Sequence, residues 1–373
     1  MVEVRPVRTK KEQKQFLEFT NVLYKGDPYF VPPLYMSEKD IFKKDYYYYD
    51  ECDAEYFLAF SEGKVVGRIG VFIQHASNKK TNEKRARFCR FDSIDDQAVA
   101  NALFDAAKEW ALARGMEKIC GPLGFSDLER EGMLVEGFDV VQTFEEQYNY
   151  EYYVKLVENY GFKKEIDWLE SQIRRKPEYD EKITRVAKYV AERYGYSFVK
   201  IESVNKFVDR YAKDVFDLID VCYGHLYGTV DLTEKMRKEL VKQFKLMLSP
   251  EYLSAILNKE GKMIAFGLAF PNIGDAMRVK GGHLTPKALI KLFKILKAPK
   301  VIDLGLVAVH PDYRNMGVNA MFMKLMSDWL AEGKSEHFET NLNLETNSQI
   351  LAQWQYFDAK QVKRRRSFIL ELK

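Results

Sequence analysis

The stretch that decides the fold runs from Leu304 to Ala320 and reads LGLVAVHPDYRNMGVNA. Its opening residues, LGLVAV, predict a strand, and a helix is expected from about Val318 to Leu330. A short polar turn containing Gly317 separates the two. The first N–H groups of a helix have no partner within the helix, and the helix dipole is positive at that end. The stretch therefore predicts a turn that binds an anion.

Two common phosphate-binding motifs are missing from this stretch of sequence. It contains neither G-x-x-x-x-G-K-[ST] nor G-x-G-x-x-G, so a P-loop nucleotidase and a dinucleotide-binding crossover are not expected. The stretch instead resembles the central motif of the GNAT acyltransferase superfamily, V-x-P-x-x-[RQ]-x-x-G-x-[GA]. Asn319 stands at its last position. Four residues fall on the pattern: Val309, Pro311, Arg314 and Gly317.

The resemblance implies a co-substrate. In GNAT enzymes this turn binds the pyrophosphate of acetyl-CoA, and backbone groups of the preceding strand contact the pantetheine arm. Acetyl-CoA or another acyl-CoA is therefore the expected ligand. By this match the residues expected to bind it are Leu306, Val307, Ala308, Val309, Arg314, Asn315, Met316, Gly317, Val318, Asn319, Ala320 and Asn347.

The chain also contains a rough internal repeat. Residues 56–73 predict an antiparallel hairpin with a turn at Glu62-Gly63-Lys64, and residues 253–270 repeat it with a turn at Glu260-Gly261-Lys262. In both halves a strand, an amphipathic helix, another strand and a closing helix follow. A repeat of this length predicts two units of the same fold.

A second signature supports the repeat. Residues Asn149 to Phe162 resemble the late GNAT pattern N-x-x-x-x-x-x-L-x-x-x-G-F, and residues 347–359 are a weaker echo. The predicted fold is α/β: two tandem GNAT-like domains, each with a central mixed, mainly antiparallel sheet flanked by helices. The expected divisions are an N-terminal domain, 1–175, a linking helix, 176–195, and a C-terminal domain, 196–373.

The two halves differ at the anion-binding turn. The first half has FDSIDDQA at residues 91–98, with no glycine and with carboxylates at Asp92, Asp95 and Asp96. Acidic residues there cap a helix well, but they repel a pyrophosphate. The N-terminal domain is therefore predicted to be degenerate, and acyl-CoA binding is assigned to the C-terminal domain.

Composition limits the class of protein. A length of 373 residues suits two domains, and 46% hydrophobic with 30% charged residues is ordinary for a globular chain. No segment approaches the roughly 18 apolar residues that span a bilayer, and the four cysteines form no C-x-x-C pair. We expect a cytoplasmic protein, monomeric or homodimeric, with no membrane partner and no metal site. A net charge of +3 is too small to indicate a nucleic-acid partner by itself.

Acyl transfer needs a base for the amine, and we weighed several candidates for it. Glu339, Glu345 and His225 are the favoured catalytic candidates, with His310 and Asp231 also considered. His225 and Asp231 lie in the loop 223–231, which by resemblance recognises the acceptor.

The general acid is harder to place. GNAT enzymes often carry a tyrosine seven residues after the asparagine that begins the last long helix, which here is Asn347. That count reaches Trp354 instead of a tyrosine. Trp354 is expected to be a core or pocket residue, so the acid either comes from elsewhere or is not needed.

The sequence supports three functions. The favoured one is an acyl-CoA-dependent N-acyltransferase that acts on a small-molecule or peptide amine. The second is a non-catalytic protein that keeps the GNAT fold to bind a ligand or to serve as a scaffold. The third is an aminoacyl-tRNA-dependent transferase. Two basic runs, Arg174-Arg175-Lys176 and Lys363-Arg364-Arg365-Arg366, would then contact RNA phosphates; otherwise both runs are expected to be solvated faces.

Overall fold

The computed structural model describes residues 1–176, 181–245 and 247–372. Its first half contains, in the predicted order, the hairpin, strand, helix, strand and closing helix, with further elements between them. The elements, in chain order, are β1 (Glu3–Pro6), α1 (Lys10–Leu23), α2 (Tyr35–Glu38), β2 (Cys52–Ser61), β3 (Lys64–Gln74), α3 (His75–Thr81), β4 (Arg85–Ser93), α4 (Gln97–Leu112), β5 (Lys118–Gly121), β6 (Met133–Glu136), α5 (Tyr152–Tyr160) and β7 (Lys163–Arg174).

The second half repeats this order, with an additional helical excursion between its third and fourth strands. Its elements are α6 (Glu181–Tyr194), β8 (Ser197–Phe198), α7 (Val204–Tyr223), α8 (Glu234–Phe244), β9 (Leu253–Leu257), β10 (Met263–Pro271), α9 (Gly274–Met277), α10 (Pro286–Lys297), β11 (Val301–Val309), α11 (Val318–Ala331), β12 (His337–Thr340), β13 (Asn343–Leu344), α12 (Ser348–Gln353) and β14 (Asp358–Glu371).

Both predicted hairpins form, as β2–β3 and β9–β10, and α11 begins at Val318 as expected. The last helix is shorter than the echo at 347–359. It ends at Gln353, because the chain from Asp358 onward pairs with β7 as β14. Within the span 176–195 expected for the linking helix, the structure has α6 from Glu181 to Tyr194, and residues 177–180 lie outside the described residues.

Local chemistry explains where several helices begin and end. Thr9 and Glu12 form a reciprocal capping box at the start of α1, and the Asp96 carboxylate caps α4. Helix α5 ends at Gly161, whose φ of 114° lies in the region that favours glycine. The turn before α11 likewise needs Gly317, at a φ of 80°.

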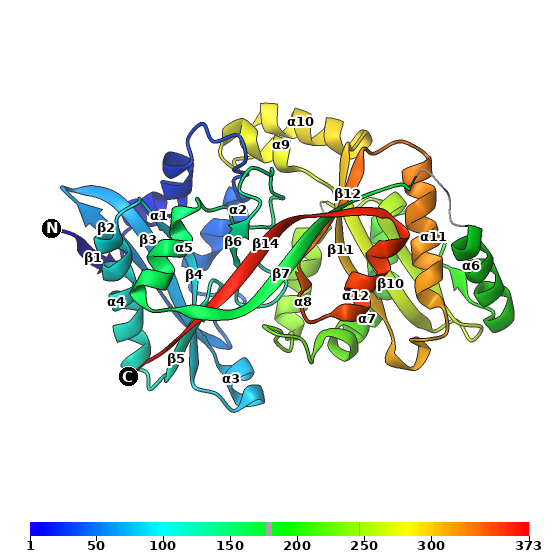
Figure 1. Ribbon diagram of the computed structural model, residues 1–373, viewed down its shortest axis with the longest axis horizontal. Coiled ribbons are helices and arrows are strands. Elements are labelled where there is room, and N and C mark those ends of the chain that lie inside the picture. The colour runs from blue at the N-terminus through cyan, green and yellow to red at the C-terminus, as the bar shows by residue number, and fades with distance from the viewer. Residues whose placement is uncertain (177–180, 246, 373) are drawn as a thin grey trace.

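The described strands form one sheet in the order β1-β2-β3-β4-β5-β14-β7-β12-β11-β10-β9-β8. The two halves exchange their last long strands within it. β14, from the end of the second half, pairs with β5 of the first half, whereas β7, from the first half, pairs with β12 of the second. Figure 1 shows β7 and β14 running side by side across the molecule.

This exchange bears on the expected division into 1–175 and 196–373. Each of these segments supplies a strand to the other's part of the single sheet, so a cut between them would leave both parts of the sheet incomplete. The main hydrophobic core is shared too, because Phe16 and Phe125 of the first half lie in the same buried cluster as Phe216 and Phe266 of the second.

The basic run on β14 corrects one expectation. Lys363 and Arg365 are not on a solvated face: they are 1% and 0% exposed, while Arg364 and Arg366 point to the other side of the strand. Strand side chains alternate between the two faces, so every second residue of the run points inward. Lys363 and Arg365 are therefore too deeply buried to contact RNA phosphates, as the tRNA-dependent hypothesis would require.

The two inward cations form buried ion pairs. Lys363 Nζ lies 3.0 Å from Glu146 and 2.7 Å from Glu170, and Arg365 Nε donates to Glu170 at 2.6 Å. The second nitrogen of the Arg365 guanidinium lies 3.2 Å from Glu146. These contacts join β14 to β7 and to the loop that carries Glu146, in the middle of the continuous sheet.

Neighbouring arginines on β14 provide a test of this arrangement. Arg365→Ala should lower the free energy of unfolding by roughly 3–5 kcal/mol, because it leaves Glu146 and Glu170 buried with one cation fewer. Arg364→Ala removes a side chain that is 25% exposed and should cost about 1 kcal/mol or less. Urea denaturation of both variants measures the difference, and equal losses would contradict the buried pairing.

Candidate functional site

The strand that leads into the predicted turn separates from its neighbour. β11 pairs in parallel with β12 only from Val301 to Leu304, and the last contact is the Asn341 N–H donating to the Leu304 carbonyl at 3.1 Å. The chain then continues as β13, which pairs with β7 instead. The edge of β11 from Leu306 to Val309 is thereby left open, as the resemblance to GNAT enzymes implied.

A tyrosine side chain reaches this open edge. The Tyr223 hydroxyl donates to the Val307 carbonyl at 2.8 Å and lies 3.2 Å from the Val307 N–H. Burial raises the pKa of the Tyr223 phenol, so it is protonated at neutral pH. The same edge ends at the Val309 carbonyl, which accepts hydrogen bonds from Cys222 and Arg314, both at 3.3 Å.

The turn itself is covered on one side by α6. A Cβ atom at Gly317 would lie 2.5 Å from Cγ2 of Val190. Asn315 also has a positive φ, of 54°, and no side chain caps α11. The sharp turn thus brings the N-terminus of α11 close to the end of β11, with the apolar side of the amphipathic helix α6 packed against it.

The matching turn in the first half is filled by its own side chains. Asp92 is fully buried, pairs with Arg68 at 2.7 Å and accepts a hydrogen bond from Tyr24 at 2.9 Å. The Tyr153 hydroxyl accepts the Ser93 N–H at 3.1 Å. The backbone and carboxylate groups of this turn that would face a ligand are therefore already hydrogen-bonded or ion-paired to other residues of the first half.

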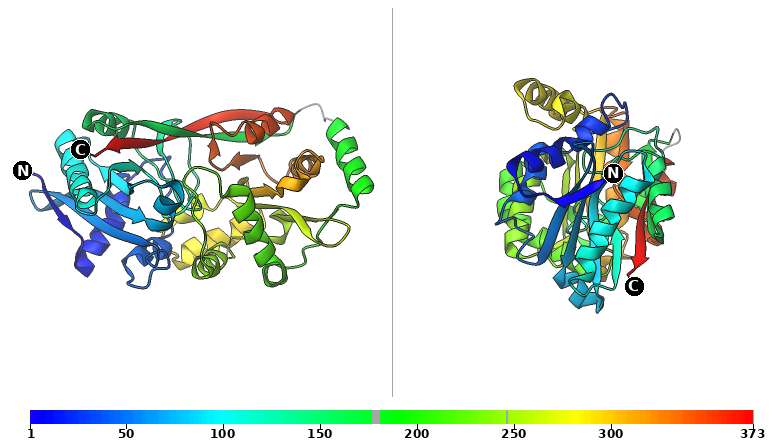
Figure 2. Two further views of the ribbon diagram at one scale, coloured as in Figure 1. Left: turned by 90° about the horizontal axis from the view of Figure 1, so that it is seen from below. Right: turned by 90° about the vertical axis from the view of Figure 1, so that its left-hand side faces the viewer.

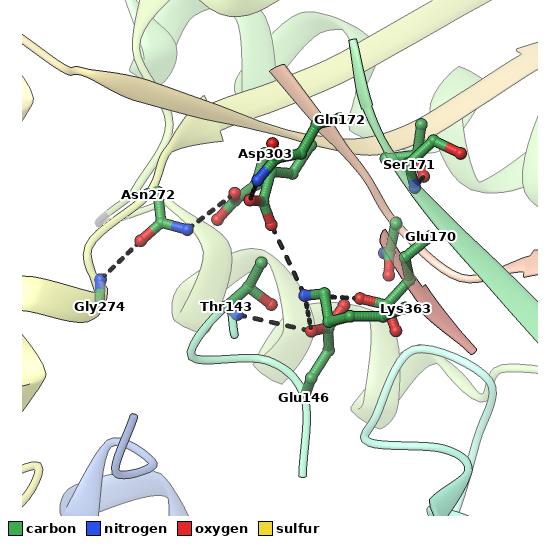
Figure 3. A network of polar contacts seen from close by, with 12 residues as sticks. Thr143, Glu146, Glu170, Ser171, Gln172, Asn272, Gly274, Asp303 and Lys363 are labelled. Atoms are coloured by element: carbon green, nitrogen blue, oxygen red, sulfur yellow. Dashed lines mark hydrogen bonds and ion pairs between the residues drawn. The ribbon is translucent and has the colours of Figure 1, made fainter. Parts of the chain in front are cut away.

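A network of buried charges lies beside the point where β11 and β12 separate (Figure 3). Asp303 of β11 and Glu339 of β12 are partners in the parallel register, one residue before the last paired position. Glu339 accepts from Gln172 at 3.1 Å, contacts His337 at 3.3 Å and lies 3.6 Å from Lys363 Nζ. Asp303 accepts from Asn272 at 3.0 Å.

The network sets different charges on its carboxyl groups. Burial raises the pKa of Glu146, but Lys363 and Arg365 outweigh it and lower that pKa to about 2. Burial likewise raises the pKa of Glu339, and the bond to His337 and the charge of Lys363 reverse the effect, so its net shift is downward. Glu339 is therefore ionised at neutral pH.

Two other carboxyls shift in the opposite direction. Burial and the nearby charge of Glu339 raise the pKa of Asp303 well above its usual range. Burial and the charge of Glu146 raise the pKa of the half-buried Glu145 to about 8. Titratable groups whose pKa values are driven apart in one place are a frequent sign of a functional site.

Several polar atoms beside the network make no hydrogen bond to other described residues. They are Asp303 Oδ2 and His337 Nδ1; both amide atoms of the buried Gln142, four residues before Glu146 in the chain, are likewise without a partner among the described residues. Buried polar groups are satisfied in most native proteins, so such a cluster indicates a place where a ligand or ordered water binds.

The structure places the predicted catalytic residues in three different environments. Glu339 lies in the buried network. Glu345 accepts the Asp167 N–H at 3.1 Å and pairs with Lys164 at 2.9 Å, which is a structural role. His225 is exposed on the loop between α7 and α8.

Asn347 and Trp354 flank the last helix, α12, and both make hydrogen bonds to residues nearby in the chain. Asn347, expected to contact CoA, caps α12 by accepting the Ile350 N–H at 3.3 Å. Trp354 is 8% exposed and donates to Asn343 at 2.8 Å. A packed indole here agrees with the expectation of a core or pocket residue.

Sequence reasoning missed most of the network. Asp303, Glu146, Glu170 and Lys363 come from four separate segments, and only the strand exchange brings them together. The one available signal was Asp303, a single charge in the apolar strand VIDLGLVAV. Within the described ranges, no group of three or more His, Cys, Asp or Glu is arranged to hold a metal ion.

No helix in the described parts of the chain combines the length and apolarity needed to cross a bilayer.

Comparison with known proteins gives relatives for the whole chain, although no family model matches it. Protein YghO of Escherichia coli (strain K12) is 26% identical over 355 residues, 92% of this chain and 89% of that protein. A Caulobacter vibrioides protein named bacterial ceramide synthase is 28% identical over 307 residues, 80% of this chain and 78% of that protein.

Solved structures agree on the fold. A tandem GNAT protein from the clavulanic acid biosynthesis pathway matches with a TM-score of 0.58 at 14% identity, over 100% of this chain and 99% of that one. The chain therefore has the tandem GNAT fold, with the exchange of strands described above.

The shifted carboxyl at Glu145 predicts a pH dependence of stability. Between its ordinary pKa of 4.5 and about 8, the folded protein holds a proton on Glu145 that the unfolded chain has lost. The free energy of unfolding should therefore fall as pH rises through this window, by up to about 1.4 kcal/mol per pH unit.

Substitution isolates this contribution. Glu145→Gln should reduce the fall in the free energy of unfolding with rising pH, because the amide does not titrate. At the lower pH limit of the window, the free energy of unfolding should be unchanged. Urea midpoints measured across the window provide the comparison. An undiminished slope in the variant would show that Glu145 is not the group responsible.

Proposed function

We propose that this chain is an acyl-CoA-dependent N-acyltransferase whose reaction takes place in its second half. The observation that carries the proposal is the position of Asp303 and Glu339. They are buried on β11 and β12, one residue before the last paired position, close to where the strands separate, and Asp303 retains an unpartnered oxygen. A carboxylate next to an opening between strands suits an amine that must lose a proton before it attacks.

The donor would lie in the opening and in the turn. The backbone of Leu306 to Val309 would contact the pantetheine arm, and the N-terminus of α11 after Gly317 would face the pyrophosphate. A cavity of about 380 Å³ adjoins this turn at Tyr313. Arg193 and Lys259 line it and offer positive charge for the nucleotide end of CoA.

The chemistry assigns roles to two side chains. Glu339 accepts the proton of the acceptor amine as the nitrogen attacks the thioester carbon and the C–N bond forms. The C–S bond of the tetrahedral intermediate then breaks, and the departing thiolate takes a proton. Tyr223, protonated and hydrogen-bonded at Val307, is the candidate donor in place of the tyrosine that Trp354 replaces.

The acceptor we propose is the amine of a long-chain lipid. Support comes from the relative named bacterial ceramide synthase and from an apolar cluster next to the network. This cluster contains Val31, Phe144, Phe270 and Met277, and Phe144 directly precedes Glu145 in the chain. The cytoplasmic location and the monomeric or homodimeric state expected from the sequence remain predictions.

A binding protein without catalysis is the second candidate, and specific contacts favour it. Tyr223 occupies the backbone groups of Val307, Val190 packs against Gly317, and Trp354 stands where GNAT enzymes often have a tyrosine. Under this hypothesis the fold retains a ligand site while the chemistry has been lost.

Glu339 and Glu345 form a matched pair for testing the catalytic role. Glu339→Gln should lower kcat by roughly 100-fold or more, the range typical of a lost general base, with KM for acyl-CoA little changed. Glu345→Gln should leave kcat within about twofold, because its contacts to Lys164 and the Asp167 N–H are structural. Release of free thiol with long-chain amine as acceptor gives the readout.

Equal losses of kcat in both variants would contradict the assignment. Unchanged activity in Glu339→Gln would require the base to be another group.

Calorimetry with acetyl-CoA and palmitoyl-CoA separates the two candidate functions. Gly317→Glu should weaken binding at least about tenfold, because it adds a negative charge where the pyrophosphate is expected. Gly333→Glu is the control: it has a similar φ of 67° at the other end of α11, with open space around it. Absence of heat from the native protein at millimolar ligand would overturn acyl-CoA binding, and binding without turnover would favour the second candidate.

A further inference from the structure

We propose that α10 rests on the surface of a lipid bilayer that contains anionic lipids. The helix belongs to the excursion between β10 and β11 that the repeat does not account for. Its sequence, PKALIKLFKILK, followed by APK up to Lys300, contains five lysines and no acidic residue. A basic amphipathic helix of this kind is typical of proteins that bind at a membrane interface.

The outward face of α10 carries large apolar side chains. Ile290 is 58% exposed and Phe293 is 66% exposed, the latter a high value for a phenylalanine in a folded protein. Three residues apart, the two lie on the same side of the helix. Single exposed apolar residues are common, but an aliphatic and an aromatic side chain together on one helix face indicate a surface that another body covers.

Charge favours a lipid surface as the occupant. Lys287, Lys294 and Lys297 are exposed, and none of them forms an ion pair with another described residue. Two further lysines are paired, Lys291 with Asp275 at 3.3 Å and Lys300 with Glu336 at 3.5 Å. Free ammonium groups around Ile290 and Phe293 complement phosphate headgroups, while the two apolar side chains enter the boundary of the acyl chains.

The fold holds α10 in a position to make this contact. The Thr285 side chain caps its start and Pro286 occupies its first turn. Its inner side, including Ala288 and Leu292, is at least partly buried, and Leu292 packs on the same apolar cluster as Phe144 and Phe270. The right-hand view of Figure 2 shows α9 and α10, in yellow, projecting beyond the body of the molecule.

Helix α10 is connected to the charged network through the apolar cluster on which it packs. The apolar cluster beneath α10 includes Ile273, and the neighbouring Asn272 donates to Asp303 at 3.0 Å. The proposal departs from the expectation of no membrane partner, which rested only on the lack of a spanning segment. It does not depend on acyl transfer, because vesicle binding is measured without substrate.

Cosedimentation with vesicles tests the proposal. The full-length protein should bind vesicles of phosphatidylcholine and phosphatidylglycerol, bind pure phosphatidylcholine much more weakly, and be released by high salt. Lys294→Gln/Lys297→Gln should weaken binding roughly tenfold or more. Ile290→Ser/Phe293→Ser should weaken it by at least about tenfold, because two large apolar side chains no longer enter the lipid.

Matched variants elsewhere on the surface complete the design. Lys10→Gln/Lys11→Gln removes the same charge from the start of α1, and Val221→Ser removes an apolar side chain that is 50% exposed on α7. Both should bind as the native protein does, and all variants should keep its melting temperature. Absence of binding to anionic vesicles, or equal weakening by the control variants, would overturn the proposal. So would a dimer that dissociates in Ile290→Ser/Phe293→Ser without any vesicle binding, because a second copy would then cover this face.

Discussion

The pairing of Lys363 and Arg365 with Glu146 and Glu170 is the interaction on which the rest of the structure depends. Burying four charges carries a large desolvation cost, which is offset only when every charge has close partners. Here the cations come from the last strand of the chain and the carboxylates from the first half. The two halves are therefore joined through their centre, and neither can form this network alone.

The same network sets the chemistry beside the opening between β11 and β12. Lys363 lies 3.6 Å from Glu339 and helps to keep that carboxylate ionised, while burial and the charges of Glu339 and Glu146 raise the pKa values of Asp303 and Glu145. A site that combines an ionised carboxylate with carboxyl groups of raised pKa can accept a proton at one position and retain one for hydrogen bonding at another. These functions are those needed to bind an amine and deprotonate it.

The sequence predicted features that depend on neighbouring residues. The turn around Gly317, the start of α11 and both hairpins follow from local periodicity and from glycine positions, and all are present. The exchange of β7 and β14 could not be read in this way, because either strand could pair within its own half without changing its pattern. The burial of Lys363 and Arg365 was missed for a related reason: a run of cations normally faces solvent, and only distant carboxylates make burial possible. Glu339 was predicted as a base, but the roles of Asp303 and Tyr223 could be recognised only once the strands and the end of α7 were placed.

A crystal structure of the protein with bound coenzyme A tests the central claim most directly. The account predicts the pyrophosphate at the N-terminus of α11 beside Gly317, the pantetheine arm along Leu306 to Val309 with Tyr223 displaced from the Val307 peptide or hydrogen-bonded to the arm, and the sulfur at the point where β11 and β12 separate, on the side of Glu339. Coenzyme A bound at the start of α4 in the first half, or with its sulfur remote from Glu339, would contradict it.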